Sequence, residues 1–568
     1  RNRGYHLTNI TIYDGTGKPA FTGDILIQGS KILRLENATS GSISQESIPE
    51  NTIQVDCQGL AAAPGFIDMH SHSDSGLPLH PEAECLIRQG ITTTVGGNCG
   101  SSAAGICKDD DSAWKRYLEA GLAKWNGLDG YFETIEKIRP AVNIAMITGH
   151  GDLRRQIVGD SGRPLTSDEK QQMRSLAQRA MSQGAFGISS GLEYVPGRFA
   201  DIDELAHASL GVVPFNGIHA SHIRNEGPML IESIEEIEAV TEKSNVRFEV
   251  SHLKACGPEN WGKVRQVLEM FGAAKARGLN ISCDFYPYLA SSTGLSIVLP
   301  DWALQNGKNA ALALLEPYGS MPGFARDTAG TGRDAPEFSG GLPKPKANFA
   351  EGQIAFSERA KQACAEADTR TLVQGGWDKI VITSVTNPGD KWMEGMNVQD
   401  ISWKLESSPS ETAMGILVRN HMNVGIVRHA MSEDDLIAVM QYPDSCVVTD
   451  GSVSIPAKGK IHPRSIGTYP RLLGRYVREL GILPMEEAVR KCTSLPASKL
   501  GLHGRGVLVE GYMADLVIFD PDKIADKSTY QEPWQYPVGI FAVFVNGEPV
   551  IWEGEITGNR PGQALRRV

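Results

Sequence analysis

The stretch Pro64-Gly65-Phe66-Ile67-Asp68-Met69-His70-Ser71-His72-Ser73-Asp74 decides the fold that the sequence predicts. It is an apolar run that ends in His-x-His. Residues two apart on a strand point to the same face, so His70 and His72 should present two imidazoles at the end of one strand. Two adjacent imidazoles bind metals well at neutral pH and make poor core residues. The stretch therefore favours a metal site over a surface pair of histidines.

Short apolar runs like this one recur along the chain, with helical segments between them. One helix is predicted after residue 166, because Thr166 and Glu169 form a capping box and Gly184 can end the helix. Alternating strands and helices indicate a parallel sheet. Eight units of this kind predict a (β/α)₈ TIM-type barrel, whose active site lies at the C-terminal ends of the strands. The runs are 65–70, 91–95, 142–148, 185–189, 218–222, 247–252, 280–286 and 446–449.

The two ends of the chain have a different character. Residues 1–63 and 492–568 contain short β-like runs, and Asn546-Gly547 is a typical hairpin turn. We expect both ends to pair into one small β-sandwich, with the barrel at 64–491. A long gap between the last two runs predicts an insertion at 293–444, which we interpret as a lid over the catalytic end rather than a surface appendage.

Composition excludes several classes of protein. The 568 residues are 41% hydrophobic and 21% charged, which is typical of a globular protein. A net charge of −12 argues against nucleic-acid binding, and no apolar run reaches the roughly 18 residues that span a membrane. The nine cysteines include no Cys-x-x-Cys and favour a reducing compartment, with cytoplasmic location expected. A periplasmic or secreted location after signal removal stays open, as does a homo-oligomer.

Further candidate ligands follow other apolar runs. Cys99 comes after the second run, His222 and His252 end the fifth and sixth, and Asp450 follows the eighth. A barrel would bring these groups together with His70 and His72. Thiolate and imidazole ligands favour Zn²⁺ over Mg²⁺ or Ca²⁺. Zinc makes water a nucleophile near neutral pH, and Asp450 could deprotonate that water and pass the proton to a leaving group.

With these motifs in view, the chain resembles the amidohydrolase superfamily and, within it, the D-aminoacylases (N-acyl-D-amino-acid deacylases). His-x-His marks only the superfamily, whereas Asn98-Cys99-Gly100, Ser251-His252-Leu253-Lys254 and His462-Pro463-Arg464 are specific to the deacylases. The matching segments run in order over nearly the whole chain. They are GFIDMHSHSD, RQGITTTVGGNCGSSAAG, GISSGLEYVPGRFA, ASHIRNEG, SHLKACGPENWGK, DFYPYLASSTGL, TDGS, HPRSIGTYPRLLGRYVRE and GYMADLVIFDP.

The resemblance implies one tight zinc site formed by Cys99, His222 and His252. It implies a second, weaker site formed by His70 and His72 with the help of Asp450, and it makes Asp450 the general acid/base. Many superfamily members bridge two metals with a carboxylated lysine. The corresponding region here has no obvious lysine, and Cys99 takes the place of a ligand.

The same resemblance implies that Lys254, Tyr286 and Arg464 bind the carboxylate of the substrate, with Tyr194 and Ser292 nearby. A buried carboxylate needs charge-assisted donors, and arginine supplies a two-pronged one. The alternatives are a surface ion pair for Arg464, a solvated side chain for Lys254 and a packing aromatic for Tyr194.

The sequence therefore predicts zinc-dependent hydrolysis of the amide bond of N-acyl-D-amino acids. A first alternative keeps the site and changes the substrate to an L-Xaa-D-Xaa dipeptide or another N-acylated natural product. A second is a non-catalytic amidohydrolase scaffold, which would require lost ligands. A cyclic-amide hydrolase or deaminase rests on fold analogy alone.

Overall fold

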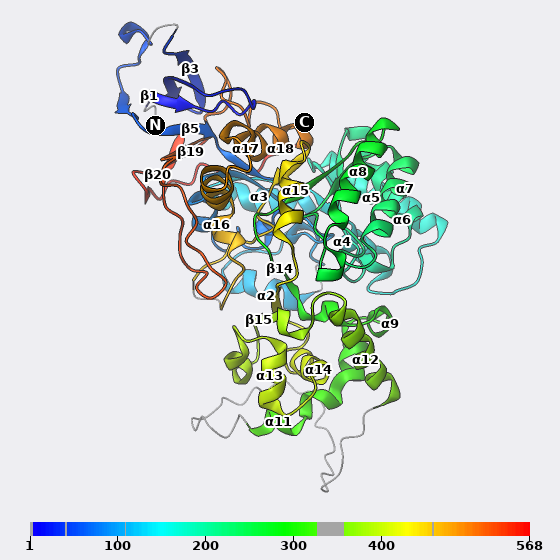
Figure 1. Ribbon diagram of the computed structural model, residues 1–568. Coiled ribbons are helices and arrows are strands. Elements are labelled where there is room, and N and C mark those ends of the chain that lie inside the picture. The colour runs from blue at the N-terminus through cyan, green and yellow to red at the C-terminus, as the bar shows by residue number, and fades with distance from the viewer. Residues whose placement is uncertain (1–3, 40–42, 108–109, 327–356, 457–458, 568) are drawn as a thin grey trace. The chain divides into compact units, whose positions relative to one another are not determined.

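The computed structural model describes residues 4–39, 43–107, 110–326, 357–456 and 459–567 (Figure 1). The chain forms two compact units. One comprises Arg1–Leu289 and Met431–Val568, and the other is Ala290–Ala430. None of the helices in the described ranges is both long and apolar enough to cross a membrane.

The first unit contains the barrel. Its strands are parallel to their neighbours and form two hydrogen-bonded sheets, β6-β7-β8 and β9-β10-β11-β12-β13-β17. Strands β8 and β9 are two parts of one strand interrupted at Ile147, so the described residues contain eight barrel strands, in agreement with the eight predicted runs. They are β6 (Phe66–Asp68), β7 (Ile91–Gly96), β8 (Asn143–Met146) with β9 (Thr148–Gly149), β10 (Gly187–Gly191), β11 (Ile218–His222), β12 (Arg247–Val250), β13 (Ile281–Phe285) and β17 (Ser445–Val447).

Side chains and loop backbone close the barrel between its last and first strands. The Thr449 backbone N–H donates to Asp68 over 2.9 Å, and the Thr449 hydroxyl donates to the same carboxylate. One step further, the Asp450 N–H donates to the His70 carbonyl over 2.9 Å. The closure therefore joins the segments that carry two of the predicted ligands. The predicted (β/α)₈ fold is confirmed.

Helices follow the strands around the barrel. The predicted capping box is present, since the Thr166 hydroxyl accepts from the Glu169 N–H and the Glu169 carboxylate accepts from the Thr166 N–H. The helices are α1 (Glu84–Ile87), α2 (Asp111–Glu119), α3 (Gly127–Ile138), α4 (His150–Val158), α5 (Ser167–Ser182), α6 (Ile202–Val212), α7 (Leu230–Ser244), α8 (Lys263–Ala276), α15 (Glu433–Gln441), α16 (Arg464–Arg471), α17 (Met485–Cys492) and α18 (Ser494–Leu500).

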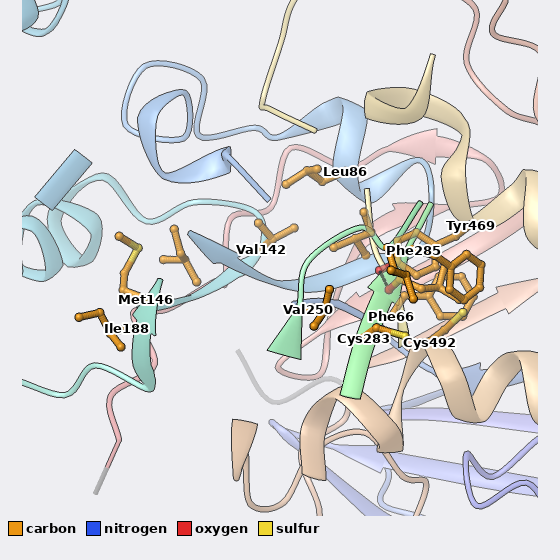
Figure 2. Packing of buried hydrophobic residues seen from close by; sticks show 14 of the residues in the cluster. Phe66, Leu86, Val142, Met146, Ile188, Val250, Cys283, Phe285, Tyr469 and Cys492 are labelled. Atoms are coloured by element: carbon orange, nitrogen blue, oxygen red, sulfur yellow. Dashed lines mark hydrogen bonds between the residues drawn. The ribbon is translucent and has the colours of Figure 1, made fainter. Parts of the chain in front are cut away.

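The core lies where the strands meet these helices. Strands β10, β11 and β13 are buried along their whole length, as parallel strands covered on both faces are. Figure 2 shows Phe66, Phe285 and Tyr469 grouped with Cys283 and Cys492. The rings of Phe66 and Tyr469 stack with centroids 5.0 Å apart, which fixes α16 against the first strand.

Both chain ends form one β-rich layer in the first unit. The sheet runs β21-β20-β19-β18-β5-β1-β2-β3, with β4 parallel to β1, and the antiparallel pair β5 and β18 joins the two ends. Asn546 and Gly547 make the predicted hairpin turn with φ of 50° and 79°. The strands are β1 (Gly4–Ile12), β2 (Phe21–Gln28), β3 (Lys31–Asn37), β4 (Thr52–Asp56), β5 (Ala61–Pro64), β18 (Leu516–Phe519), β19 (Ile540–Val545), β20 (Glu548–Trp552) and β21 (Glu555–Ile556).

The second unit, Ala290–Ala430, interrupts the barrel sequence between β13 and β17. Its antiparallel sheet has the order β14-β16-β15. Its range differs from the expected 293–444, because α15 buries Leu436, Val439 and Met440 in the barrel core. Residues 327–356 of this insertion lie outside the described residues, and its role as a lid stays a prediction. The elements are β14 (Ser291–Gly294), α9 (Asp301–Leu304), α10 (Lys308–Leu315), α11 (Pro322–Arg326), α12 (Glu358–Leu372), β15 (Ile380–Ser384), α13 (Val398–Leu405), α14 (Pro409–Arg419) and β16 (Gly425–Arg428).

Candidate metal centre and active site

The six predicted metal ligands all lie at the C-terminal ends of barrel strands. They come from four loops and one strand end, and the first compact unit holds all of them. Their ligand atoms form two groups, and the atoms of each group lie within 4.8 Å of one another. The first group is Cys99, His222 and His252, and the second is His70, His72, Cys99 and Asp450.

Cys99 belongs to both groups. Its Sγ lies 3.8 Å from His252 Nε2 and 3.4 Å from His70 Nε2. In the first group, His222 Nδ1 lies 3.0 Å from His252 Nε2. In the second, Asp450 Oδ1 lies 3.1 Å from His72 Nε2 and 3.4 Å from His70 Nε2. One sulfur thus stands at the junction of two clusters of nitrogen and oxygen ligands.

The electrostatics of the cluster suit a cation. Burial opposes ionisation of Cys99, but His70 and the hydrogen bonds from His222, His252 and His70 hold the pKa of the thiol well below its usual value. Burial likewise opposes ionisation of Asp450, and Arg464 is the main cause that brings its pKa well below the usual range. A thiolate and a carboxylate among imidazoles form a donor set that zinc prefers.

The imidazoles respond to the same negative groups. Partial burial disfavours protonated His72, but the hydrogen bonds and negative charges of Asp450 and Cys99 together outweigh that cost and raise the pKa to about 10. Burial also disfavours protonated His222, whereas Glu226 and Cys99 raise its pKa to about 10. The cluster therefore favours positive charge at its centre, and a metal ion with affinity for sulfur and nitrogen meets that demand.

Close backbone packing places Cys99. Its own φ is 52°, in the left-handed region that non-glycine residues rarely adopt. A Cβ atom at Gly191 would lie 2.2 Å from the Cys99 carbonyl oxygen, and one at Gly149 would lie 2.5 Å from that of Gly100. The Gly100 N–H also donates to the Ser189 hydroxyl over 2.9 Å. Glycines on the neighbouring strands are thus required for the thiol to reach the cluster.

Two more ligands share this unusual backbone. His252 has a φ of 36° and Asp450 a φ of 47°. Left-handed backbone at a non-glycine residue costs on the order of 1–3 kcal/mol and concentrates at functional sites. Three such residues around one cluster indicate that the fold gives up stability to aim these side chains.

A layer of carboxylates, which the sequence motifs did not indicate, surrounds the imidazoles. Asp284 accepts from His70 Nδ1 over 3.2 Å, and Glu193 accepts from His222 Nε2 over 2.9 Å. Glu226 Oε1 lies 2.9 Å from His252 Nδ1. A carboxylate on the outer nitrogen of a ligating histidine fixes the ring and its tautomer. The signal available in the sequence was an acidic residue within an apolar run, as for Asp284, or four residues after one, as for Glu193 and Glu226.

Three of the predicted substrate-binding residues lie beside the cluster. Arg464 Nη1 is 2.8 Å from Asp450 Oδ2, and its guanidinium lies 4.6 Å from the centre of the Tyr286 ring. Lys254 Nζ lies 5.7 Å from the same ring. All three side chains are buried. They place two cations next to the candidate metal site.

Lys254 has an additional role that the sequence did not indicate. Its Nζ donates to Glu226 over 2.6 Å and lies 2.8 Å from His252 Nδ1. Glu226 therefore links a cation to a candidate zinc ligand. The Tyr194 ring packs 4.7 Å from the His222 ring, whereas Ser292 belongs to the other compact unit and its role stays a prediction.

A barrel with imidazole, thiolate and carboxylate groups at its C-terminal end defines the class of metal-dependent hydrolases. The model of the amidohydrolase family matches residues 54–277 and 461–551. The D-aminoacylase of Alcaligenes xylosoxydans xylosoxydans is 31% identical over 98% of this chain and 96% of its own.

Solved structures agree with this comparison. The N-acyl-D-glutamate deacylase of Bordetella bronchiseptica, complexed with zinc and a phosphonate mimic of the tetrahedral intermediate, is 30% identical with a TM-score of 0.77. A D-aminoacylase with a binuclear metal centre is 28% identical with a TM-score of 0.76. Each match covers 99% of both chains. The chain belongs to the amidohydrolase family and, within it, to the D-aminoacylases.

The carboxylate layer yields a prediction on metal affinity. Glu193→Gln should lower zinc affinity about 10- to 100-fold, the usual effect of removing such a partner, because the His222 ring loses its anchor. Competition with a chromophoric chelator measures this affinity. Glu236→Gln is the matched control, since Glu236 pairs with Arg224 rather than with a ligand, and it should bind zinc as the wild type does. Unchanged affinity in the Glu193 variant would show that this carboxylate does not support the metal.

Proposed function

We propose that the protein hydrolyses the amide bond of N-acyl-D-amino acids with the help of zinc, releasing a carboxylate and a free D-amino acid. The observation that carries the proposal is the adjacency of the thiolate–imidazole cluster to the Arg464–Asp450 pair. The names of the similar proteins, a D-aminoacylase and an N-acyl-D-glutamate deacylase, support this substrate class.

The donor sets suggest how the metal is held. We assign the tight zinc site to Cys99, His222 and His252, and a second, weaker site to His70, His72 and Asp450 with Cys99 shared. Zinc bound there would lower the pKa of water and polarise the amide carbonyl. The similar D-aminoacylase is described by one-metal activation and second-metal attenuation, which fits a single tight site here.

Asp450 is the residue we assign to proton transfer. Its carboxylate is buried, ionised and directed toward the cluster, so it can accept a proton from the attacking water. The water oxygen forms the new bond to the carbonyl carbon. Asp450 then returns the proton to the amide nitrogen as the carbon–nitrogen bond breaks. No other reactant is consumed.

Arg464, Lys254 and Tyr286 are the residues we assign to the carboxylate of the substrate. The guanidinium provides a two-pronged donor and lies over the Tyr286 ring, 4.6 Å from its centre. Fixing the carboxylate at one point and the carbonyl at another leaves two arrangements of the α-carbon substituents. This geometry allows a choice of stereochemistry, and Tyr194, whose ring packs 4.7 Å from the His222 ring, is the proposed wall that favours D.

The carboxylate contact does not by itself determine the acyl group. An L-Xaa-D-Xaa dipeptide or another N-acylated natural product ends in the same carboxylate, so these substrates belong in any test. The substrate is a small molecule in every case. The cytoplasmic location and the state of assembly stay predictions.

Asp450→Asn tests the proton transfer. It keeps the size of the side chain and removes the base, so turnover should fall about 10²- to 10⁴-fold. Zinc content, measured by elemental analysis, should stay near the wild-type value because the tight site does not use Asp450. Asp435→Asn is the control, since the Asp435 carboxylate is buried and accepts from the Gly262 backbone N–H rather than from a residue of the cluster. Near-normal turnover in Asp450→Asn would end the assigned role.

A substrate panel tests the activity and its selectivity. N-acyl-D-amino acids should be hydrolysed far faster than the L series, and methyl esters of the D series should show a raised KM. Arg464→Lys keeps the charge but loses the two-pronged donor, so KM for the free acid should rise roughly 10- to 100-fold, equivalent to about 1–3 kcal/mol. Equal hydrolysis of D and L substrates, or of acid and ester, would contradict the proposal.

A further inference from the structure

The backbone that leads into Arg464 is held by a neighbouring side chain. His462 Nδ1 accepts a hydrogen bond from the Arg464 N–H over 3.0 Å. A ring nitrogen that accepts a hydrogen bond carries no proton, so Nδ1 is the unprotonated nitrogen of the His462 ring. The bond joins a side chain to the backbone two residues on, as in turns that Asn and Asp stabilise.

This hydrogen bond lies where the position of Arg464 is set. Arg464 is the first residue of α16, after Pro463. From there its guanidinium reaches Asp450 and the face of Tyr286. A small rotation of the backbone at the start of the helix would move the guanidinium at the end of a long side chain by much more.

Tyrosines surround the ring of His462. Its centroid lies 6.0 Å from that of Tyr286, 5.4 Å from that of Tyr288 and 5.2 Å from that of Tyr530, all in edge-to-face contact. His462 is only 4% exposed. The imidazole is therefore locked in one orientation, with Nδ1 toward the backbone. Tyr286 is also the ring on which Arg464 lies, so one tyrosine contacts both residues.

Tyr286, Tyr288 and Tyr530 form a box of rings around His462, and Tyr530 comes from the C-terminal part of the chain. Tyr530 lies in the segment between β18 and β19. In the same segment, Trp534 Nε1 donates to the Gly459 carbonyl over 2.8 Å, three residues before His462. The segment thus fastens the loop that connects Asp450 to Arg464.

We propose that His462 is a positioning residue that sets Arg464, and thereby the selectivity of the site for a free carboxylate. The inference rests on the proposed function of Arg464. A packing role alone would predict a general loss of stability or activity. A positioning role predicts a rise in KM only for substrates whose free carboxylate contacts Arg464.

Two variants separate the hydrogen bond from the ring. His462→Phe keeps a buried ring and loses the acceptor, whereas His462→Asn loses the ring and keeps an oxygen that can accept from the N–H two residues on. The Phe variant should raise KM for N-acetyl-D-amino acids about three- to tenfold, the scale of one lost hydrogen bond, with kcat little changed. KM for the methyl ester should not change. The Asn variant should show a smaller rise in KM for the acid than the Phe variant.

A matched control is available in the β-rich layer. His6 is buried, and its Nδ1 lies 3.2 Å from Gln54 Nε2 on a neighbouring strand. His6→Phe should leave the acid-to-ester ratio of KM unchanged. If His462→Phe does not fold, Tyr530→Leu opens one wall of the box and should raise KM for the acid in the same selective way.

The outcomes are distinct from those for the proposed function. A wild type inactive on the whole panel would remove the proposed function, and a crystal structure of His462→Phe would then decide the inference. Displacement of Arg464 from Asp450 would support it, and retention of their 2.8 Å contact would overturn it. With an active wild type, an unchanged acid KM in the Phe variant, or an equal rise for acid and ester, would also overturn it.

Discussion

The position of one sulfur atom constrains the whole candidate site. Cys99 Sγ is shared by both groups of ligand atoms, with His222 and His252 on one side and His70, His72 and Asp450 on the other. Its loop can approach that point only because Gly149 and Gly191 lack side chains. A thiolate that is largely removed from solvent is costly unless positive charge compensates it, and Cys99 is partly buried. The surrounding imidazoles and the shape of the loop therefore depend on one another.

From that centre the structure can be followed outward in layers. Asp284, Glu193 and Glu226 each meet the outer nitrogen of one imidazole. Glu226 then binds Lys254, and Asp450 binds Arg464. Lys254 and Arg464 are thus paired with carboxylates that also contact histidines. Variants of the substrate-binding residues should therefore also change metal binding, and variants of the metal ligands should also change substrate binding.

Much of the fold could be predicted because strand periodicity and capping act over short distances. All eight apolar runs correspond to barrel strands, and the helix after Thr166 begins with the predicted capping box. The bounds of the insertion could not be read, because the burial of α15 depends on contacts with the distant part of the barrel. Local sequence contains no measure of such contacts.

The candidate site was predictable to the same degree. His70, His72, Cys99, His222, His252 and Asp450 lie together because strand ends converge in a barrel, and this convergence follows from the fold class. The carboxylate partners of these residues could not be predicted from the fold class. Glu193 and Glu226 lie in loops whose course no pattern specifies, and the pairing of Lys254 with Glu226 spans 28 residues. The roles assigned to these side chains remain proposals.

Metal binding by a Cys99 variant tests the central claim most directly. We predict that the wild type holds one tightly bound zinc and that its cobalt-substituted form shows a thiolate-to-metal charge-transfer band. Cys99→Ala should lose the band and most of the zinc, whereas Cys107→Ala, which changes an exposed cysteine, should keep both. Full zinc content in Cys99→Ala, measured by elemental analysis, would contradict the account, because the sulfur at the centre of the site would then not be a ligand.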